Sequence, residues 1–220
     1  MDKTILNDNQ IRVLDAVSQS RELCDFFYLT GGTALAEFYL RHRLSEDLDF
    51  FSESEFDVAG INAFLAKNKS KLGIKKIDFQ RSFNRNLYFL DFKDGSVKME
   101  FTYFPFPRIE KKRKHGALNI DSAIDIAVNK IFTVYQNPRS RDFIDLYCIN
   151  KSFGFDIGGL VKKAKVKFDF HVDSLQLGSQ FLKVRVLKDY PTMAIDIKND
   201  DWQNYFEIEA QKLKSRIIKP

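Results

Sequence analysis

Residues 43–51 of the 220-residue chain have the sequence RLSEDLDFF, in which two aspartates occupy alternate positions of an apolar run. Aspartate is depleted in β-strands, so an Asp-x-Asp pair within a strand calls for an explanation. Side chains two positions apart on a strand share a face. We therefore expect Asp47 and Asp49 to point the same way and Leu48 and Phe50 to point into the core.

Two carboxylates this close repel each other unless a cation lies between them, and hard oxygen ligands of this kind suit Mg²⁺. The Asp47–Asp49 pair is therefore a candidate metal site. A solvated acidic strand face with no site at all is the alternative, and it is the usual explanation of a single Asp-x-Asp pair.

A later segment, at residues 96–104, shows the same alternation of apolar and polar positions. Met99 and Phe101 fall on one face of this predicted strand, and Glu100 falls on the other. Glu100 is therefore a candidate for the third carboxylate of a metal site on a neighbouring strand. Taken alone, it also fits an ordinary exposed glutamate.

Two glycines, Gly31 and Gly32, separate a short apolar run from a predicted helix at residues 33–41. Glycine lets the backbone approach a ligand closely, and a helix N-terminus offers free N–H groups to a phosphate. Thr33 adds a hydroxyl group at the same place. The segment is typical of a phosphate cradle, with a plain strand-to-helix turn as the alternative.

The hydrophobic pattern predicts an α+β fold, with a mixed sheet and helices over residues 1–107 and a helical half over 118–220. Beyond a proline-containing, basic stretch at 105–116 we expect no further strands. In the helical half that follows, we expect Asp121 to cap one helix and Ser140 to cap the next. The other expected elements are a helix at 8–24, a helix after Asp57, strands at 26–29, 48–51, 74–81 and 86–93, and a hairpin turn at Asp94-Gly95.

The composition suits an intracellular protein with a polyanionic partner. The net charge of +5 favours RNA, DNA or a nucleotide, and the basic run Lys111–Lys114 fits either an RNA contact or a solvated loop. The two cysteines show no zinc spacing and fit a reducing compartment. The N-terminus does not resemble a signal peptide, and no apolar run is long enough for a bilayer. We expect a soluble, cytoplasmic protein with no membrane partner.

In combination, these segments resemble the AbiEii/AbiGii toxin branch of the DNA polymerase β-like nucleotidyltransferase superfamily. The order of Gly31-Gly32-Thr33, Asp47-x-Asp49 and a later strand carboxylate is that of the superfamily. Residues 32–36 and 43–51 resemble the toxin branch itself, and residues 125–130 and 139–147 are similar to its two later motifs. The resemblance covers roughly residues 28–150 and departs from the usual pattern at Ile131-Phe132-Thr133.

The resemblance implies a Mg²⁺-dependent enzyme that uses a nucleoside triphosphate. Asp47 and Asp49 would hold the metal on the triphosphate, and Glu100 would complete the acidic triad and help activate the acceptor hydroxyl. Two metal ions ~3.5–4 Å apart would stabilise the attacking and leaving oxygens of an in-line displacement. The expected nucleotide contacts are Gly31, Gly32, Thr33, Ser45 and Arg141.

The helical half is expected to contribute Lys130 and Asp142 to catalysis. Lys130 flanks an apolar helix stripe, from which we expect it to reach across the inter-domain cleft to the triphosphate; the alternative is a surface lysine. Asp142 and Asp145 share a helix face and are expected to contact Lys130 or the nucleotide. The alternatives are a first-turn dipole interaction for Asp142 and an ion pair with Arg141 for Asp145.

The resemblance further implies that the acceptor is RNA such as tRNA, and that the protein is the toxin of a toxin–antitoxin pair with an antitoxin protein as its partner. Protein hydroxyl groups remain an alternative acceptor. The rival hypothesis is a non-catalytic nucleotide- or RNA-binding module with the same fold; keeping all three carboxylates together with Lys130 argues against it.

Overall fold

The computed structural model describes residues 4–110 and 113–217, so Lys111 and Lys112 of the basic run lie outside the described residues. The described chain divides into two compact units. Unit 1 comprises residues up to Tyr39 together with Ser45–Ser122. Unit 2 comprises Leu40–Leu44 together with the chain from Ala123 onward. The α+β class and the helical C-terminal half are as predicted.

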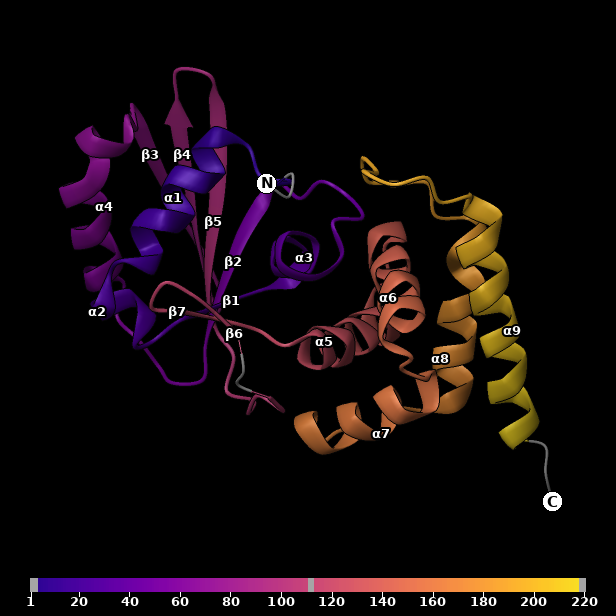
Figure 1. Ribbon diagram of the computed structural model, residues 1–220. Helices are drawn as coiled ribbons and strands as arrows, with labels where there is room; N and C mark the ends of the chain where they lie inside the picture. The colour runs from indigo at the N-terminus through magenta and orange to yellow at the C-terminus, as the bar shows by residue number, and fades with distance from the viewer. Residues whose placement is uncertain (1–3, 111–112, 218–220) are drawn as a thin grey trace. The chain divides into compact units, whose positions relative to one another are not determined.

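A mixed β-sheet forms the centre of unit 1 (Figure 1), and within the described residues its strand order is β3-β4-β5-β2-β1-β7-β6. The pairs β2–β5 and β1–β7 are parallel, and the other neighbours are antiparallel. The strands are β1 (Tyr28–Thr30), β2 (Asp47–Ser52), β3 (Lys76–Ser82), β4 (Arg85–Phe92), β5 (Gly95–Tyr103), β6 (Arg113–His115) and β7 (Leu118–Ile120).

The apolar face of this sheet forms the core of unit 1. Phe50 on β2 stacks against Phe101 on β5 with ring centroids 5.0 Å apart, and both rings are fully buried. On the same face, the Tyr88 hydroxyl donates to Asn62 of α4 at 2.8 Å, so α4 covers the apolar side. The helices of unit 1 are α1 (Asp8–Ser18), α2 (Arg21–Cys24), α3 (Gly31–Leu35), the π-helix η1 (Ala36–Leu40), whose last residue belongs to unit 2, and α4 (Val58–Leu72).

Two helix predictions for unit 1 need correction. The helix expected over 8–24 ends at Ser18, whose hydroxyl donates to the Asp15 carbonyl at 2.8 Å and so competes with continued helical bonding. The helix expected over 33–41 begins at Gly31 and changes to π-helical geometry at Ala36. The helix predicted to follow Asp57 is confirmed, with the Asp57 carboxylate accepting from Ala59 N at 2.8 Å.

The expectation of no further strands beyond the stretch at 105–116 is wrong. Strand β6 lies within that stretch, and β7 lies after it, parallel to β1 with Leu29 opposite Ile120. Strands of three residues are too short to show a period, which explains why the pattern missed them. The next helix begins at Ala123, and the carboxylate of Asp121, its predicted cap, accepts from the Thr30 hydroxyl at 2.6 Å.

Smaller corrections concern a turn and a cap. The turn between β4 and β5 consists of Lys93-Asp94, because Gly95 is already paired with Phe92. Ser140 is the first residue of α6, and Arg139 occupies the cap position.

The larger segment of unit 2 consists of helices joined by loops (Figure 1). The fully buried Trp202 and Phe206 of the last helix pack against Phe143 of α6, with centroid distances of 6.4 and 4.8 Å. Within the described residues, no helix is both long enough and apolar enough to cross a membrane. The helices are α5 (Ala123–Gln136), α6 (Ser140–Phe153), α7 (Ile157–Phe168), α8 (Ser174–Phe181), the 3₁₀-helix η2 (Leu182–Arg185) and α9 (Asn199–Ile217).

Candidate active site

Strand β2 carries the two aspartates on the face opposite to its buried residues. Leu48 and Phe50 are fully buried, whereas Asp47 and Asp49 are half-buried. This is the arrangement predicted from the period of two, and it places both carboxylates on the polar face of the sheet.

Strand β5 adds the third carboxylate to the same face. It runs parallel to β2 in a register that pairs Asp49 with Glu100 and Asp47 with Lys98. Glu100 is 6% exposed, so the alternative of an ordinary exposed glutamate is wrong. The three carboxylates therefore lie on one face of two adjacent strands, in unit 1 alone.

Two cations pair with these acids. Lys98 Nζ lies 2.8 Å from Asp47 Oδ2. Arg85 of β4 donates from Nε to Glu100 Oε1 at 2.6 Å and makes a second bond to Oε2, and the Thr102 hydroxyl donates to Oε1 at 2.8 Å. Burial raises the pKa of Glu100, but the bonds from Arg85 and Thr102 outweigh burial, so the pKa is lowered overall. Glu100 is therefore held as a carboxylate.

Arg85 interacts with more than one carboxylate of this face. The hydrogen bond to Glu100 raises the pKa of the Arg85 guanidinium, and the charges of Glu100, Asp49 and Asp47 raise it further. Within the described part of the chain, no group of three or more His, Cys, Asp or Glu side chains is arranged to hold a metal ion. The acidic face is thus charge-compensated by Arg85 and Lys98.

The glycine turn lies directly against the acidic face. Gly31 adopts a φ of +73°, and a Cβ at this position would collide with the Asp49 carboxylate, 3.2 Å from its Cγ. Gly32 is buried in α3. The buried Thr33 hydroxyl donates to the main-chain oxygen of Asp47, so it ties α3 to the start of β2.

Ser45 precedes β2, and its main-chain oxygen accepts from Gln10 Nε2 at 2.8 Å. The structure thus brings Gly31, Thr33 and the three carboxylates together. It gives Ser45 a main-chain contact with α1. Whether Gly31, Gly32, Thr33 and Ser45 contact a nucleotide stays a prediction.

A second charged cluster lies inside unit 2. Lys130 Nζ lies 2.6 Å from Asp142 Oδ1 and 2.8 Å from Asp145 Oδ2. Lys130 is only 8% exposed, so the surface-lysine alternative is wrong. The predicted contact of both aspartates with Lys130 is confirmed. Asp142 also lies in the first turn of α6, which is the position that the alternative hypothesis of a helix-dipole interaction requires.

Asp145 is the centre of this second cluster. Arg43 donates to it from Nε at 2.7 Å and from a terminal guanidinium nitrogen at 2.8 Å, and His42 Nε2 lies 2.7 Å from Oδ1. The ion pair proposed as an alternative with Arg141 is therefore replaced by one with Arg43. Burial raises the pKa of Asp145, but Lys130, Arg43 and His42 outweigh burial and hold it well below its usual range.

Arg141 itself is half-buried in α6, and its predicted phosphate contact stays a prediction. Besides Lys130, Asp142 has a second basic partner, Arg139, which donates from Nε to Asp142 Oδ2 at 3.0 Å. Burial raises the pKa of Asp142, whereas Lys130 and Arg139 lower it, and the net shift is downward.

A family model described as "Nucleotidyl transferase AbiEii toxin, Type IV TA system" matches residues 12–210 of the chain. The chain belongs to the AbiEii family. It is therefore a nucleotidyltransferase of a type IV toxin–antitoxin family. An uncharacterised protein of Aquifex aeolicus is 33% identical to the chain over 150 residues, which is 66% of this chain and 68% of that protein.

Two solved structures share the fold. A candidate nucleotidyltransferase from Helicobacter pylori superimposes with a TM-score of 0.62 at 20% identity, covering 96% of this chain and 97% of that one. MenT4, a nucleotidyltransferase toxin from Mycobacterium tuberculosis, superimposes with a TM-score of 0.55 at 14% identity, covering 93% and 81%. The family model also covers residues 151–210, which the sequence motifs did not match.

In this AbiEii chain, sequence reasoning predicted Lys130 but missed four other partners of the carboxylates: Lys98, Arg85, Arg43 and His42. Lys98 shares the face of Glu100 because the two residues are two apart on β5. The contact of Arg85 with Glu100 could also have been inferred from the sequence. A hairpin turn at Lys93-Asp94 sets Leu87 opposite Glu100, and Arg85 is then a diagonal neighbour of Glu100. Arg43 and His42 carried no such signal, because their partner Asp145 lies about a hundred residues away in the sequence.

Proposed function

We propose that this protein transfers a nucleotidyl group from a nucleoside triphosphate to an RNA acceptor, such as tRNA, with release of pyrophosphate, in a Mg²⁺-dependent reaction. The observation that carries the proposal is the alignment of Asp47, Asp49 and Glu100 on one face of β2 and β5, with Gly31 against Asp49. Family membership supports the reaction class.

The donor set of this face fits Mg²⁺ bound together with a triphosphate. Mg²⁺ is usually held by one or two carboxylates plus phosphate oxygens and water, so it does not require a protein cage of three ligands. Asp47 and Asp49 would hold the metal, which would supply charge stabilisation at the transferring phosphoryl group. Glu100 would join as the third acid only after its bonds to Arg85 loosen.

The chain's own residues then have separate proposed roles. The backbone at Gly31, Gly32 and Thr33 would bind the phosphates, because glycine allows a close backbone approach and the Thr33 hydroxyl is already bonded to Asp47. Glu100, held ionised, would accept the proton of the acceptor hydroxyl. Arg85 and Lys98 would neutralise phosphate charge on the same face. Lys130, Asp142, Ser45 and Arg141 are retained as further proposed site residues.

The cellular role follows from the family. We propose that the protein acts as the toxin of a toxin–antitoxin pair and that a cognate antitoxin protein controls it. The net charge of +5 supports a polyanionic acceptor.

The test of the function is transfer from each labelled triphosphate, with Mg²⁺, to total cellular RNA. Asp47→Asn and Asp49→Asn should each abolish labelling while thermal unfolding changes little, because both side chains lie on the polar face. Asp78→Asn is the matched control: Asp78 is an exposed carboxylate of the same sheet that pairs with Lys76 at 2.7 Å. Transfer at the wild-type rate by either active-site variant would refute the metal assignment. Nucleotide binding without transfer by the wild type would favour the non-catalytic alternative.

The proposed role of Glu100 has its own test. Glu100→Gln should lower turnover more than it weakens triphosphate binding, because the amide cannot accept the acceptor's proton. Turnover and the Kd of the triphosphate would be measured on the same preparation. Equal losses in both quantities would assign Glu100 to nucleotide binding instead.

A further inference from the structure

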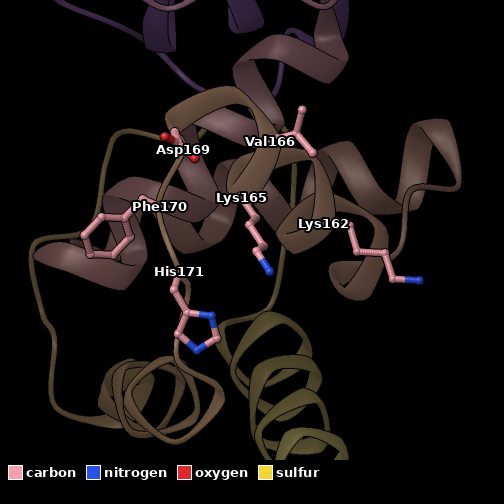
Figure 2. Close-up of a pocket in the computed structure, with 6 residues that line it drawn as sticks. All are labelled: Lys162, Lys165, Val166, Asp169, Phe170 and His171. Carbon is pink, nitrogen blue, oxygen red and sulfur yellow. The ribbon is translucent and has the colours of Figure 1, made fainter.

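An open pocket lies in unit 2 at the C-terminal end of α7 (Figure 2). Its volume is about 630 Å³, within the range of roughly 300–1,000 Å³ that ligand sites occupy. Helix α7 contributes Lys162, Lys165 and Val166 to the wall of the pocket. The loop that follows contributes Asp169, Phe170 and His171.

The α7 side of this pocket is cationic. Lys162 and Lys165 are three residues apart, hence on one face of the helix, and both are exposed. Neither forms an ion pair with any residue that the structure describes. By contrast, the neighbouring Lys167 is buried and paired with Asp125 at 2.8 Å. Two lysines are thus available to bind anionic groups in the pocket.

The loop side presents a supported aromatic ring. Phe170 is 46% exposed, yet its ring contacts Phe132 and Tyr135 of α5 at centroid distances of 5.5 and 5.9 Å. Asp169 adopts a left-handed conformation with φ of 45°, and Phe170 N donates to the Lys165 carbonyl at 3.3 Å. The ring is therefore held in position, and Phe170 is one of the residues that line the pocket.

Lysines and an exposed, supported ring that line one pocket are two elements with which proteins bind single-stranded nucleic acid. The lysines pair with phosphates, and the ring stacks on a base whatever its identity. A purely acidic chain such as poly-glutamate would use the lysines but would have no flat group to place on Phe170. Asp169 lines the same pocket and offers an acceptor for a ribose 2′-hydroxyl group, which RNA carries.

We propose that this pocket binds single-stranded RNA, with Lys162 and Lys165 on the phosphates and a base stacked on Phe170. The proposal rests on the proposed function in that the RNA held here is the acceptor. The binding itself requires neither triphosphate nor Mg²⁺, so it can be measured apart from the reaction.

The first experiment measures binding of the full chain to an unstructured, fluorescently labelled oligoribonucleotide at several salt concentrations, without triphosphate. The double variant Lys162→Ala/Lys165→Ala should bind about tenfold more weakly near physiological salt. Its plot of log affinity against log salt should flatten by about 1.4, since each phosphate contact to a single strand contributes roughly 0.7. The matched control is Lys163→Ala/Lys183→Ala, which removes two exposed lysines of unit 2 that do not line the pocket. Equal weakening by both pairs, or no RNA binding by the wild type, would overturn the proposal.

The second experiment tests stacking. An oligoribonucleotide that contains 2-aminopurine should lose fluorescence on binding to the wild type and recover it with Phe170→Leu, while the salt slope stays unchanged. Leucine keeps the apolar contact with Phe132 and Tyr135, and thermal unfolding checks that the variant is folded. Unchanged quenching, or competition by poly-glutamate as effective as by unlabelled RNA, would assign the pocket to another anionic partner.

The transfer assay separates this proposal from the proposed function. The double lysine variant should raise the KM for RNA with kcat unchanged, whereas Asp49→Asn should abolish transfer and bind RNA as the wild type does. Loss of RNA binding by Asp49→Asn would place the RNA on the acidic face and overturn the pocket. Failure of Asp49→Asn to reduce transfer would overturn the catalytic assignment alone.

Discussion

Gly31 combines two constraints at a single residue. Its φ of +73° lies in the region that side chains disfavour, and its missing Cβ leaves room for the Asp49 carboxylate. Only glycine satisfies both conditions, so this residue links the shape of the turn after β1 to the position of a proposed metal ligand.

We predict that Gly31→Ala lowers the free energy of unfolding by about 1–3 kcal/mol and strongly reduces transfer. The added methyl group must displace Asp49 or shift the turn. Gly60→Ala is the control: Gly60 lies in α4 with no atom within 4 Å of the added Cβ, so alanine should stabilise the helix by about 0.5–1 kcal/mol. Denaturant unfolding and the transfer assay measure both. A Gly31→Ala protein as stable and active as the wild type would contradict the close approach.

Arg85 and Glu100 give a second prediction at the residue scale, which concerns pH. Burial raises the pKa of Glu100, and Arg85 contributes to the larger downward effect. Arg85→Ala should therefore raise this pKa, so that Glu100 becomes protonated at a higher pH than in the wild type. If Glu100 must be ionised, the acid limb of the pH–rate profile should move to higher pH.

The Glu100 titration can be followed directly by carboxyl NMR. Lys76→Ala is the control, because Lys76 pairs with the exposed Asp78 away from Glu100 and should leave the profile in place. An acid limb that stays where it is in Arg85→Ala would show that ionisation of Glu100 does not limit the reaction.

At the scale of elements, residues 40–44 leave the sheet unit, fold with the helices and return to start β2. Arg43 forms a β-bridge with Met193, and Leu44 N donates to the Thr192 carbonyl at 2.8 Å. Asp145 binds the same segment through Arg43 and His42. This short segment is therefore held from two sides within unit 2.

We predict that Asp145→Asn lowers the free energy of unfolding by about 3–5 kcal/mol at neutral pH, because it leaves Arg43 and Lys130 buried without their full counter-charge. The amides of Leu44 and Ala194, which bond to Thr192 and His42, should exchange with deuterium faster. Asp173→Asn is the control, since asparagine caps the N-terminus of α8 about as well as aspartate. Unchanged exchange at these two amides would show that the β-bridge does not depend on Asp145.

The lowered pKa of Asp145 also fixes how its contribution to the free energy of unfolding changes with pH. The pKa of Asp145 lies well below its usual value of 3.8, so its stabilising contribution is present above that value. The contribution is lost as pH falls through the folded-state pKa. The stability difference between wild type and Asp145→Asn should therefore persist at pH 5 and shrink only under more acidic conditions. Chemical denaturation across this range measures it.

At the scale of the whole molecule, the chain crosses between the two units more than once, which affects whether residues 123–220 can fold alone. A fragment cut at this boundary lacks Arg43 and His42. Asp145 would then be buried without the Arg43 guanidinium and without its contact to His42, and the cost of burying its charge would rise.

We predict that the 123–220 fragment unfolds at a lower temperature than unit 2 does in the intact protein. Asp145→Asn should destabilise the fragment less than it destabilises the full chain, because in the fragment Arg43 and His42 are already missing. Calorimetry on the full chain and the fragment, each with and without Asp145→Asn, measures how strongly Asp145 depends on residues 40–44. Equal effects of Asp145→Asn in both contexts would mean that residues 40–44 contribute nothing to unit 2.

The sequence by itself determined the alternation on β2 and β5, the apolar face of the sheet and the helical character of the second half. These features depend on side-chain periods of two and 3.6, which are local and therefore visible in a linear string. For the same reason it placed Asp47 and Asp49 on one polar face. Motifs within residues 28–150 identified the family, and that resemblance added Glu100 as the third carboxylate.

Only the tertiary structure decided which cations meet those carboxylates and that Lys130 is buried against Asp142 and Asp145. It also decided that β7 extends the sheet and that Asp145 holds Arg43. Each of these contacts joins residues that are distant in the sequence and that meet through strand register or helix packing. Such contacts depend on how distant segments meet, and the free energy of meeting is set by burial and charge pairing, which no local period encodes.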